Sequence, residues 1–232
     1  MAHLPDLRRW IEAARADAPV LDLDRIRLRS PVANPGKVIA VRGNYAGTDG
    51  ASTGALAATP ELFLKSPSSV VGPSDGIELR FPGRQVDHEV ELVVVIGRRV
   101  ECVTVEHALA SVAGYCVGID VTLRGPEDRG LRKSLDGFTV LGPWLVTPDE
   151  VGDAGRLGIE LSVNDELRQC GNTAQMRHGI AALVAAAASY FVLAPGDVIM
   201  TGTPAGVGPL ARGDIVHCAI ERVGAMLVAV RR

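Results

Sequence analysis

Short apolar runs separated by turn residues make up most of this chain. From Leu62 onward, stretches rich in Val, Ile and Leu alternate with Gly, Pro and Asp, which is typical of strands joined by tight turns. An earlier run, KVIAV at 37–41, has the β-branched side chains of a buried strand. The pattern predicts strands at 37–41, 62–65, 76–79, 88–97, 112–121, 142–146, 157–165, 197–203, 214–223 and 226–232.

Only two segments have the three-and-four spacing of apolar side chains that marks a helix. The first covers residues 5–17 and ends before Pro19. The second begins at a cap on Asn172 or Thr173 and stops at Pro195–Gly196. Its apolar stripe consists of Met176, Ile180, Leu183, Val184, Ala187 and Phe191. Many strands and few helices predict a β-rich α+β fold.

Residues 42–60 (RGNYAGTDGASTGALAATP) are rich in Gly, Ser and Thr and have no apolar periodicity. This segment is long for a simple connection between two strands. It is either a mobile functional loop or a disordered one, and the sequence leaves both possibilities open.

Composition narrows the classes of function. The chain has 232 residues and a net charge of −3, so it has no basic surplus with which to bind nucleic acid. Charged residues interrupt the N-terminus where a secretory signal would be apolar, and the longest nearly apolar run, 180–194, is too short to span a bilayer. The four dispersed cysteines suggest reduced thiols that mostly fill the core. We expect a cytoplasmic protein without membrane or nucleic-acid partners.

The most informative chemical pattern is DHEVEL at 87–92. Side chains alternate along a strand, so Glu89 and Glu91 should project side by side, and Asp120 ends another apolar strand. Neighbouring carboxylates repel unless a cation or protons relieve them, and oxygen ligands favour Mg²⁺ or Mn²⁺ over zinc. The alternative is a solvated edge with two exposed glutamates. His88-Glu89 does not begin a zinc-protease motif, because Leu92 stands where the second histidine belongs.

Two cations, Arg124 and Lys133, follow the third acid. Near a hard metal ion they would suit an anionic substrate whose reaction builds negative charge on oxygen, although an ordinary basic loop is the alternative. The string TGTPAGVGPLARG at 201–213 has the glycines of a dinucleotide-binding motif, but its prolines and the strand after it favour a tight loop. There, Thr201 and Thr203 would supply hydroxyls or satisfy backbone groups.

Taken in order, these motifs resemble the fumarylacetoacetate hydrolase family over nearly the whole chain from about residue 38. The motifs are GNY (43–45), FLKSPSSVVGP (63–73), VDHEVELVVVIG (86–97), VAGYCVGIDVTLR (112–124), KSLDGFTVLGPW (133–144), RQCGNTAQM (168–176) and GDVIMTGTPAGVG (196–208). The resemblance implies a mixed β-sandwich roll, a homodimer, and a catalytic domain at 37–232 after a short N-terminal arm at 1–36.

The resemblance also implies roles for individual residues. Mg²⁺ (or Mn²⁺) would be held by Glu89, Glu91 and Asp120. The substrate would be a small 2-oxo or 2,4-dioxo acid, with Lys133 as a catalytic cation. Substrate contacts would come from Tyr45, Arg124, Gln169 and Thr203.

One departure from the family pattern affects the expected reaction. Hydrolytic members carry N-Y-x-x-H-x-x-E, whereas this chain has Thr48 and Ala51 at the His and Glu positions, so neither is a general base. Asp49 is a possible substitute. Ile119 replaces a common asparagine, and GPE at 125–127 replaces a polar segment. Hydrolysis of a carbon–carbon bond through a metal-stabilised enolate, decarboxylation, tautomerisation or isomerisation, and a non-catalytic ligand-binding role all remain open.

Overall fold

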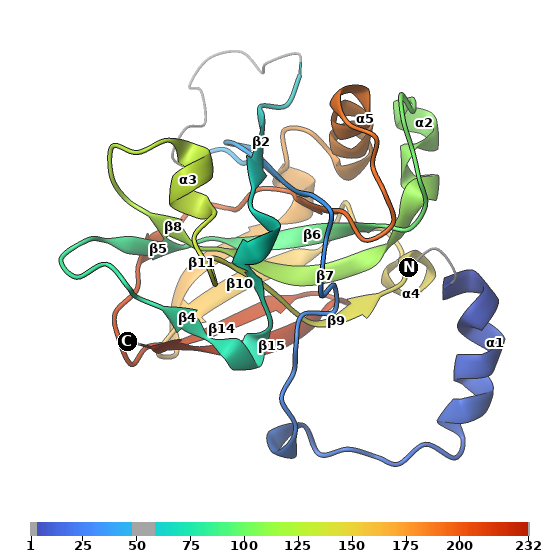
Figure 1. Ribbon diagram of the computed structural model, residues 1–232, viewed down its shortest axis with the longest axis horizontal. Coiled ribbons are helices and arrows are strands. Elements are labelled where there is room, and N and C mark those ends of the chain that lie inside the picture. The colour runs from blue at the N-terminus through green and yellow to red at the C-terminus, as the bar shows by residue number, and fades with distance from the viewer. Residues whose placement is uncertain (1–3, 48–58, 232) are drawn as a thin grey trace.

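The computed structural model describes residues 4–47 and 59–231, which form layered β-sheets with a few short helices on their surfaces (Figure 1). The largest sheet in this part of the chain has seven strands. In order across the sheet they are β2 (Leu62–Lys65), β1 (Val38–Val41), β12 (Val198–Met200), β6 (Val90–Ile96), β7 (Val112–Asp120), β9 (Thr139–Val146) and β3 (Val70–Val71).

Two smaller sheets complete the sandwich. A five-stranded sheet runs in the order β11 (Glu166–Asn172), β10 (Gly158–Val163), β14 (Ile215–Ile220), β15 (Gly224–Arg231) and β4 (Ile77–Glu78). A three-stranded sheet consists of β13 (Gly208–Pro209), β5 (Val86–His88) and β8 (Thr122–Leu123). Parallel and antiparallel pairs both occur, since β1 pairs parallel with β12 while β6 and β7 are antiparallel. The expected β-rich α+β sandwich is confirmed.

Helices lie at the margins of the sheets. The α-helices are α1 (Leu4–Arg15), α2 (Val105–Ala108), α3 (Arg129–Lys133), α4 (Pro148–Val151) and α5 (Ile180–Tyr190). Short 3-10 turns are η1 (Leu23–Arg25), η2 (Pro67–Ser69), η3 (Pro73–Asp75), η4 (Leu109–Ser111) and η5 (Thr173–Gln175). Figure 1 shows α2 and α5 side by side, while α1 stands away from the sheets. The described helices are all too short or too polar to cross a lipid bilayer.

The central strand β6 is apolar because both of its faces are covered. Val90, Leu92 and Val94 pack in the main core between the sheets. Val93 and Val95 belong to a second apolar cluster on the opposite face of the seven-stranded sheet. Alternation therefore puts Glu91 on the side of this second cluster, away from the main core.

The second predicted helix is shorter than its apolar stripe suggested. Asn172 caps the 3-10 turn η5 through a bond from the Ala174 amide, and α5 begins only at Ile180. The residues between η5 and α5 stay outside the helix, because the backbone oxygen of Asn44 accepts a hydrogen bond from the Arg177 amide. The helix also ends early, because the backbone becomes extended at Phe191 and then pairs with Val100. Periodicity alone could not show these tertiary bonds.

Some local expectations need correction. The N-terminal helix ends at Arg15, before the predicted limit at residue 17. Strand β11 was not predicted, because its sequence ELRQCGN is polar and its side chains are mostly exposed. Of the four free cysteines, Cys116 and Cys218 are buried, whereas Cys102 and Cys170 are exposed, so only half of them fill the core.

Candidate metal centre

Three acidic side chains meet where the two central strands of the large sheet come together. Glu89 lies directly before β6, Glu91 is its second residue, and Asp120 is the last residue of β7. Each contributes a carboxylate oxygen to a group whose members all lie within 4.8 Å of one another. The antiparallel register explains this, because Glu91 is paired with Gly118 and the Asp120 amide donates to the Glu89 carbonyl at 2.8 Å.

Burial excludes the alternative of a solvated acidic edge. Glu91 and Asp120 are 2% and 1% exposed, and the Glu89 side chain is 14% exposed. Buried carboxylates are costly unless charges or hydrogen bonds compensate them. The hypothesis of two exposed glutamates is therefore wrong.

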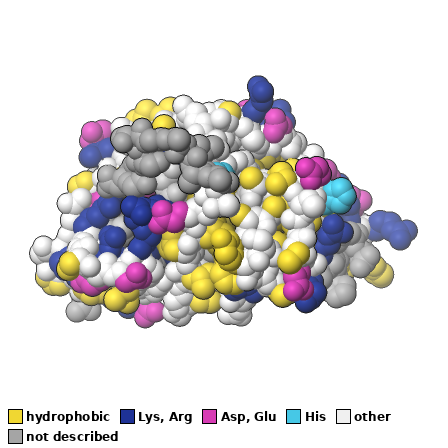
Figure 2. Space-filling model, turned by 90° about the horizontal axis from the view of Figure 1, so that it is seen from above, with side chains coloured by type: hydrophobic (Ala, Val, Ile, Leu, Met, Phe, Trp, Pro, Cys, Tyr) yellow, Lys and Arg dark blue, Asp and Glu magenta, His cyan; other side chains and the backbone are white. Residues whose placement is uncertain are grey.

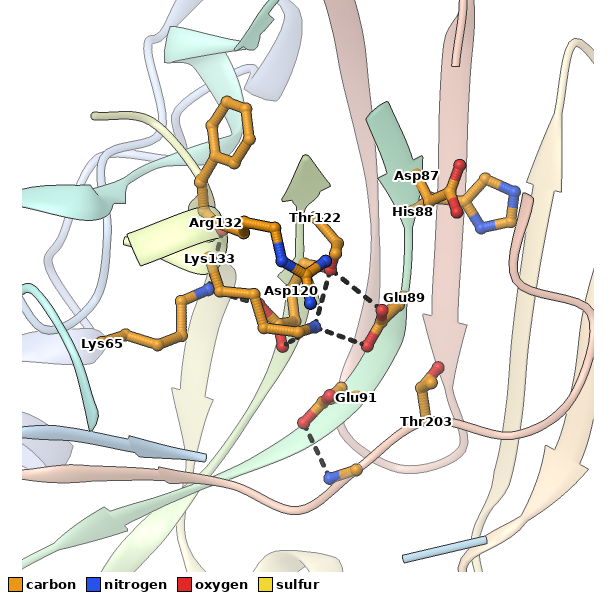
Figure 3. Close-up of polar contacts among 12 residues, drawn as sticks. Lys65, Asp87, His88, Glu89, Glu91, Asp120, Thr122, Arg132, Lys133 and Thr203 are labelled. Carbon is orange, nitrogen blue, oxygen red and sulfur yellow. Dashed lines mark hydrogen bonds and ion pairs between the residues drawn. The ribbon is translucent and has the colours of Figure 1, made fainter. Parts of the chain in front are cut away.

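Two buried lysines supply part of the compensation, as Figure 3 shows. The Lys133 ammonium donates to Asp120 at 2.6 Å, to Glu89 at 2.9 Å and to Thr122 at 2.6 Å. Lys65, from β2, donates to the other oxygen of Asp120 at 2.5 Å and to the Phe138 carbonyl at 2.8 Å. Lys65 lies within the FLKSPSSVVGP motif, but nothing in the local sequence assigned it to this site.

The pKa values show where negative charge is least relieved. Burial, followed by the charges of Asp120 and Glu89, raises the pKa of Glu91 well above its ordinary value. Burial opposes the charged form of Asp120 as well, but Lys133 and Lys65 more than offset it and lower the Asp120 pKa. When all three carboxylates are ionised, they and the two ammonium groups of Lys65 and Lys133 carry a net charge of −1. A hard divalent cation with oxygen ligands fits this donor set.

The loop after β12 closes the site from one side. The Gly202 amide donates to Glu91 at 2.7 Å, and the hydroxyls of Thr201 and Thr203 donate to backbone carbonyls of β6. Gly202 has φ +95°, and a Cβ there would lie 2.8 Å from the Asn44 Cβ, so glycine is required. The threonines thus satisfy backbone groups, one of the two roles expected of them. Thr203 also lines the cavity beside the acids.

The residues predicted to contact the substrate do not all line the cavity. Arg124 lines the cavity and donates to Asp87 at 2.5 Å. Tyr45 is 1% exposed and pairs with Met176 in an isolated bridge. Burial and the nearby Glu91 charge raise the pKa of Tyr45. Thr48, Asp49 and Ala51, the positions of the missing dyad and its possible substitute, lie outside the described residues.

Gln169 is fully buried and holds β6 against the loop after β12. Its side-chain oxygen accepts from the Val90 amide at 3.1 Å and lies 3.0 Å from the His88 Nδ1. Its side-chain nitrogen donates to the Thr203 hydroxyl and to the Pro204 carbonyl. These bonds occupy both ends of the amide inside the protein.

Two positions at which this chain departs from the family pattern, Ile119 and residues 125–127, make contacts within the protein. Ile119 points into the main core, on the opposite face of β7 from Asp120. Glu127, from the GPE segment, accepts two bonds from the Arg84 guanidinium, each of 2.7 Å. Helix α3, which follows this loop, brings Arg129 and Arg132 to the cavity wall, and no motif in the sequence indicated this.

Comparison with known proteins identifies the family. Residues 37–231 match the model of the fumarylacetoacetate hydrolase C-terminal domain. This chain belongs to the fumarylacetoacetate hydrolase family. Over 99% of its length it is 47% identical to a maleylpyruvate hydrolase of Aquipseudomonas alcaligenes, of which the match covers 84%. Over 93% it is 39% identical to a human mitochondrial oxaloacetate tautomerase, covering 73% of that protein.

A solved member of the fumarylacetoacetate hydrolase family agrees with the fold. The maleylpyruvate hydrolase of Sphingobium sp. SYK-6, in complex with manganese(II) and pyruvate, superposes with a TM-score of 0.89 and is 39% identical. The match covers 99% of this chain and 83% of that one. The chain is therefore a metal-dependent enzyme of this family, as the resemblance implied. The non-catalytic alternative is not supported.

Proposed function

We propose that this enzyme hydrolyses a carbon–carbon bond in a 2,4-dioxo acid related to maleylpyruvate, with Mg²⁺ or Mn²⁺ held by Glu89, Glu91 and Asp120. The observation that carries the proposal is the cluster of three carboxylates, with the Lys133 ammonium bonded to Glu89 and Asp120. It lies beside a cavity of about 80 Å³ that Glu89, Glu91 and Lys133 line. The maleylpyruvate hydrolases among its relatives support this choice of substrate class.

The chemistry divides between the ion and the side chains. When bound, a divalent cation would polarise the 2-oxo group and the adjacent carboxylate of the acid. Lys133 would offset negative charge that develops on the 2-oxo oxygen. Burial alone would lower the Lys133 pKa, but the charges of Asp120 and Glu89 raise it by more than burial lowers it. The Lys133 pKa is therefore above its ordinary value, and the group stays an ammonium. Lys133 therefore acts as a fixed positive charge and not as a base.

Hydrolysis needs a water molecule in addition. Its hydroxyl adds to C4, the C3–C4 bond breaks with the electron pair passing to C3, and a proton completes C3 to give pyruvate and a second carboxylic acid. A group must accept the proton from water. We propose Asp49 for this role, because the sequence has Thr48 and Ala51 at the dyad positions.

Tautomerisation is the second candidate. It moves one proton between C3 and the 2-oxo oxygen and needs no activated water, so it suits a chain without the His-Glu dyad. The likeness to an enzyme named oxaloacetate tautomerase supports this candidate. Decarboxylation would use the same fixed charges.

One experiment separates these reactions. The protein is loaded with Mg²⁺ and given 2,4-dioxopentanoate, and released pyruvate is measured with lactate dehydrogenase. Parallel samples of oxaloacetate report enol loss by ultraviolet absorbance and carbon dioxide release by a coupled assay. We expect pyruvate release that a chelator abolishes and Asp49→Asn reduces. Enol loss without pyruvate release would favour the tautomerase instead, and no metal-dependent change in either acid would overturn the proposed function.

We further propose that the enzyme is a homodimer, as the resemblance to the family implies. Light scattering coupled to size-exclusion chromatography would measure its mass in solution. A mass equal to one chain would contradict this.

A further inference from the structure

Asn44 connects three segments that lie far apart in the sequence. It comes shortly after β1 and is 1% exposed. Its side-chain nitrogen donates to the carbonyl oxygens of Thr201 at 2.8 Å and of His178 at 3.0 Å. Its side-chain oxygen accepts from the His178 amide at 2.8 Å, and its backbone oxygen accepts from the Arg177 amide at 2.7 Å. Bonds in several directions hold this buried amide in one position.

The orientation of the Asn44 amide follows from these partners. The backbone amide of His178 can only donate, so the side-chain oxygen of Asn44 must face it. The side-chain nitrogen then faces two carbonyl oxygens, which can only accept. Asn44 therefore meets Thr201 as a hydrogen-bond donor, because the opposite orientation of the amide would place like groups together at every contact.

The Thr201 carbonyl belongs to the same peptide group as the Gly202 amide. That amide donates to the Glu91 carboxylate at 2.7 Å, the bond drawn from Glu91 in Figure 3. The 201–202 peptide is trans, so its carbonyl and its amide hydrogen point in opposite directions. Asn44 and Glu91 thus bind opposite sides of one planar group, and rotation of that group would break both bonds. The Asn44 bond also polarises the peptide, which strengthens the Gly202 amide as a donor.

The 201–202 peptide depends on side chains for its orientation because it lies beyond β12, which ends at Met200. Gly202 has φ +95°, and glycine restricts backbone rotation less than any other residue. The Asn44 Cβ lies 2.8 Å from the place that a Cβ on Gly202 would take, so the two residues are in direct contact. In the described chain this peptide is held by Asn44 at its oxygen and by Glu91 at its nitrogen.

The surroundings of the cavity increase the importance of this orientation. Besides Lys133, four arginine side chains line the cavity, those of Arg42, Arg124, Arg129 and Arg132. Figure 2 shows Lys and Arg side chains gathered on the face seen from above, on the side of the molecule where α3 lies. Positive charges repel a metal ion, so its affinity depends on carboxylates that are already well placed. Lys133 orients Glu89 and Asp120, whereas the Gly202 amide orients Glu91.

We propose that Asn44 is a positioning residue for the metal ion. By holding the 201–202 peptide, Asn44 keeps the Gly202 amide on Glu91 and so fixes the direction in which that carboxylate meets the ion. This rests on the proposed function, because Glu91 is one of the proposed ligands. Partners that orient metal ligands typically contribute about ten- to a hundredfold to metal affinity.

Mn²⁺ binding measures this contribution. Electron paramagnetic resonance of free Mn²⁺ gives the affinity of the parent and of Asn44→Leu, which keeps the size and branching of the side chain but has neither donor nor acceptor. We expect the affinity of Asn44→Leu to be about ten- to a hundredfold lower. An affinity within about twofold of the parent would overturn the inference.

Thr173→Val controls for the loss of buried hydrogen bonds in general. The Thr173 hydroxyl donates to the Ala154 carbonyl at 2.9 Å and accepts from the Leu157 amide at 2.8 Å, apart from the carboxylates. We expect this variant to unfold at a lower temperature than the parent and to bind Mn²⁺ equally well. A loss of Mn²⁺ affinity as large as that of Asn44→Leu would show that Asn44 acts on stability alone.

Nuclear magnetic resonance reports on the peptide itself in the metal-free protein. Carbon-13 in threonine carbonyls and nitrogen-15 in glycine select the two Thr–Gly pairs of the sequence, 53–54 and 201–202, and Gly54→Ala removes the first. We expect a downfield, slowly exchanging Gly202 amide proton in the parent, because its acceptor is a carboxylate. In Asn44→Leu this signal should move upfield and exchange faster, while Thr173→Val should leave it in place.

An ordinary Gly202 shift in the parent would overturn the inference without any variant. Failure of the parent to bind Mn²⁺, with the Gly202 signal as expected, would instead overturn the proposed metal centre on which the inference rests.

Discussion

At the scale of single residues, Glu91 is the carboxylate whose charge the protein leaves least compensated. Its partner in the described chain is the Gly202 amide, whereas Glu89 and Asp120 contact lysines. Glu91→Gln should therefore lower Mg²⁺ affinity by at least about a hundredfold, since it removes one of the three anionic ligands that we propose. Calorimetry with Mg²⁺ checks this. The same variant should unfold at or above the parent's temperature when both are metal-free, and unchanged Mg²⁺ binding would show that the ligand set is wrong.

The raised pKa of Glu91 also predicts how metal affinity depends on pH. In the metal-free protein Glu91 keeps its proton to a higher pH than an ordinary glutamate, and metal binding must displace that proton. Mg²⁺ affinity should therefore rise as pH increases from about 4.5 and level off above the raised pKa. Titrations in buffers of different ionisation enthalpy would detect the released proton. A flat profile between pH 5 and 8 with no proton release would contradict this expectation.

Lys133 should affect turnover more than folding. With the metal bound, the ion can compensate Glu89 and Asp120, so Lys133→Met should remove mainly the positive charge that we propose lies next to the reacting oxygen. We expect turnover to fall roughly a hundredfold, about 3 kcal/mol of transition-state stabilisation. Steady-state rates and thermal unfolding in excess Mg²⁺ measure the two effects separately. Arg99→Met is a matched control on an exposed cation. A normal rate would exclude Lys133 from the reaction.

Sequence alone identified the three acids but not their surroundings. Glu89 and Glu91 follow from strand alternation, and Asp120 from its place at the end of an apolar strand. Lys65 could not be placed in this way, because it lies on the edge strand β2, separated from β7 by three strands, and meets Asp120 only in the folded chain, where α3 also packs against β2. Gln169 shows the opposite difficulty, since its residue type suits substrate binding while its four contacts are within the protein.

At the scale of elements, the pair of Arg84 and Glu127 holds the loop that leads into α3. The Arg84 guanidinium, with which Glu127 forms hydrogen bonds, lowers the pKa of Glu127 to about 2. A depressed carboxyl pKa adds stability above the unfolded value near 4.5, and this is lost as pH falls towards 2.

Glu127→Gln should consequently loosen this loop at neutral pH. We expect faster amide hydrogen exchange in residues 124–133, with little change in the sheets, because the contact is local and partly exposed. Mass spectrometry of exchanged peptides measures it. Glu101→Gln, which removes another surface partner of an arginine, should leave exchange at 124–133 as in the parent. Unchanged exchange in Glu127→Gln would mean that other bonds hold the loop.

Element prediction succeeded where one physical signal dominated. Buried strands such as β6 and β7 are apolar and β-branched, so their positions follow from the sequence. Strand β11 is polar because it lies at the edge of its sheet, and its ladder bonds leave no mark in the residue pattern. The start of α5 was displaced for a similar reason, because Asn44 lies more than a hundred residues away in sequence yet binds residues 177 and 178.

At the scale of the whole molecule, α1 is connected to the rest mainly through exposed groups. Arg8 pairs with Asp149 at 2.9 Å, and both side chains are more than half exposed. Deleting residues 2–18 should therefore leave metal affinity and the unfolding temperature close to those of the parent. Calorimetry and thermal unfolding check this, and light scattering shows whether the mass of the proposed dimer changes by more than the deleted residues. A large loss of stability would contradict this expectation.

The pairing of Lys65 and Lys133 with Asp120 has a consequence for the life of the enzyme in the cell. The two lysine side chains offset the repulsion between the carboxylates when no metal ion is bound. The strands that carry Glu91 and Asp120 are also largely buried. We therefore expect the newly made chain to fold before it binds a metal ion. The metal ion would then bind reversibly to the folded enzyme, and the local concentrations of magnesium and manganese would determine which ion occupies the site.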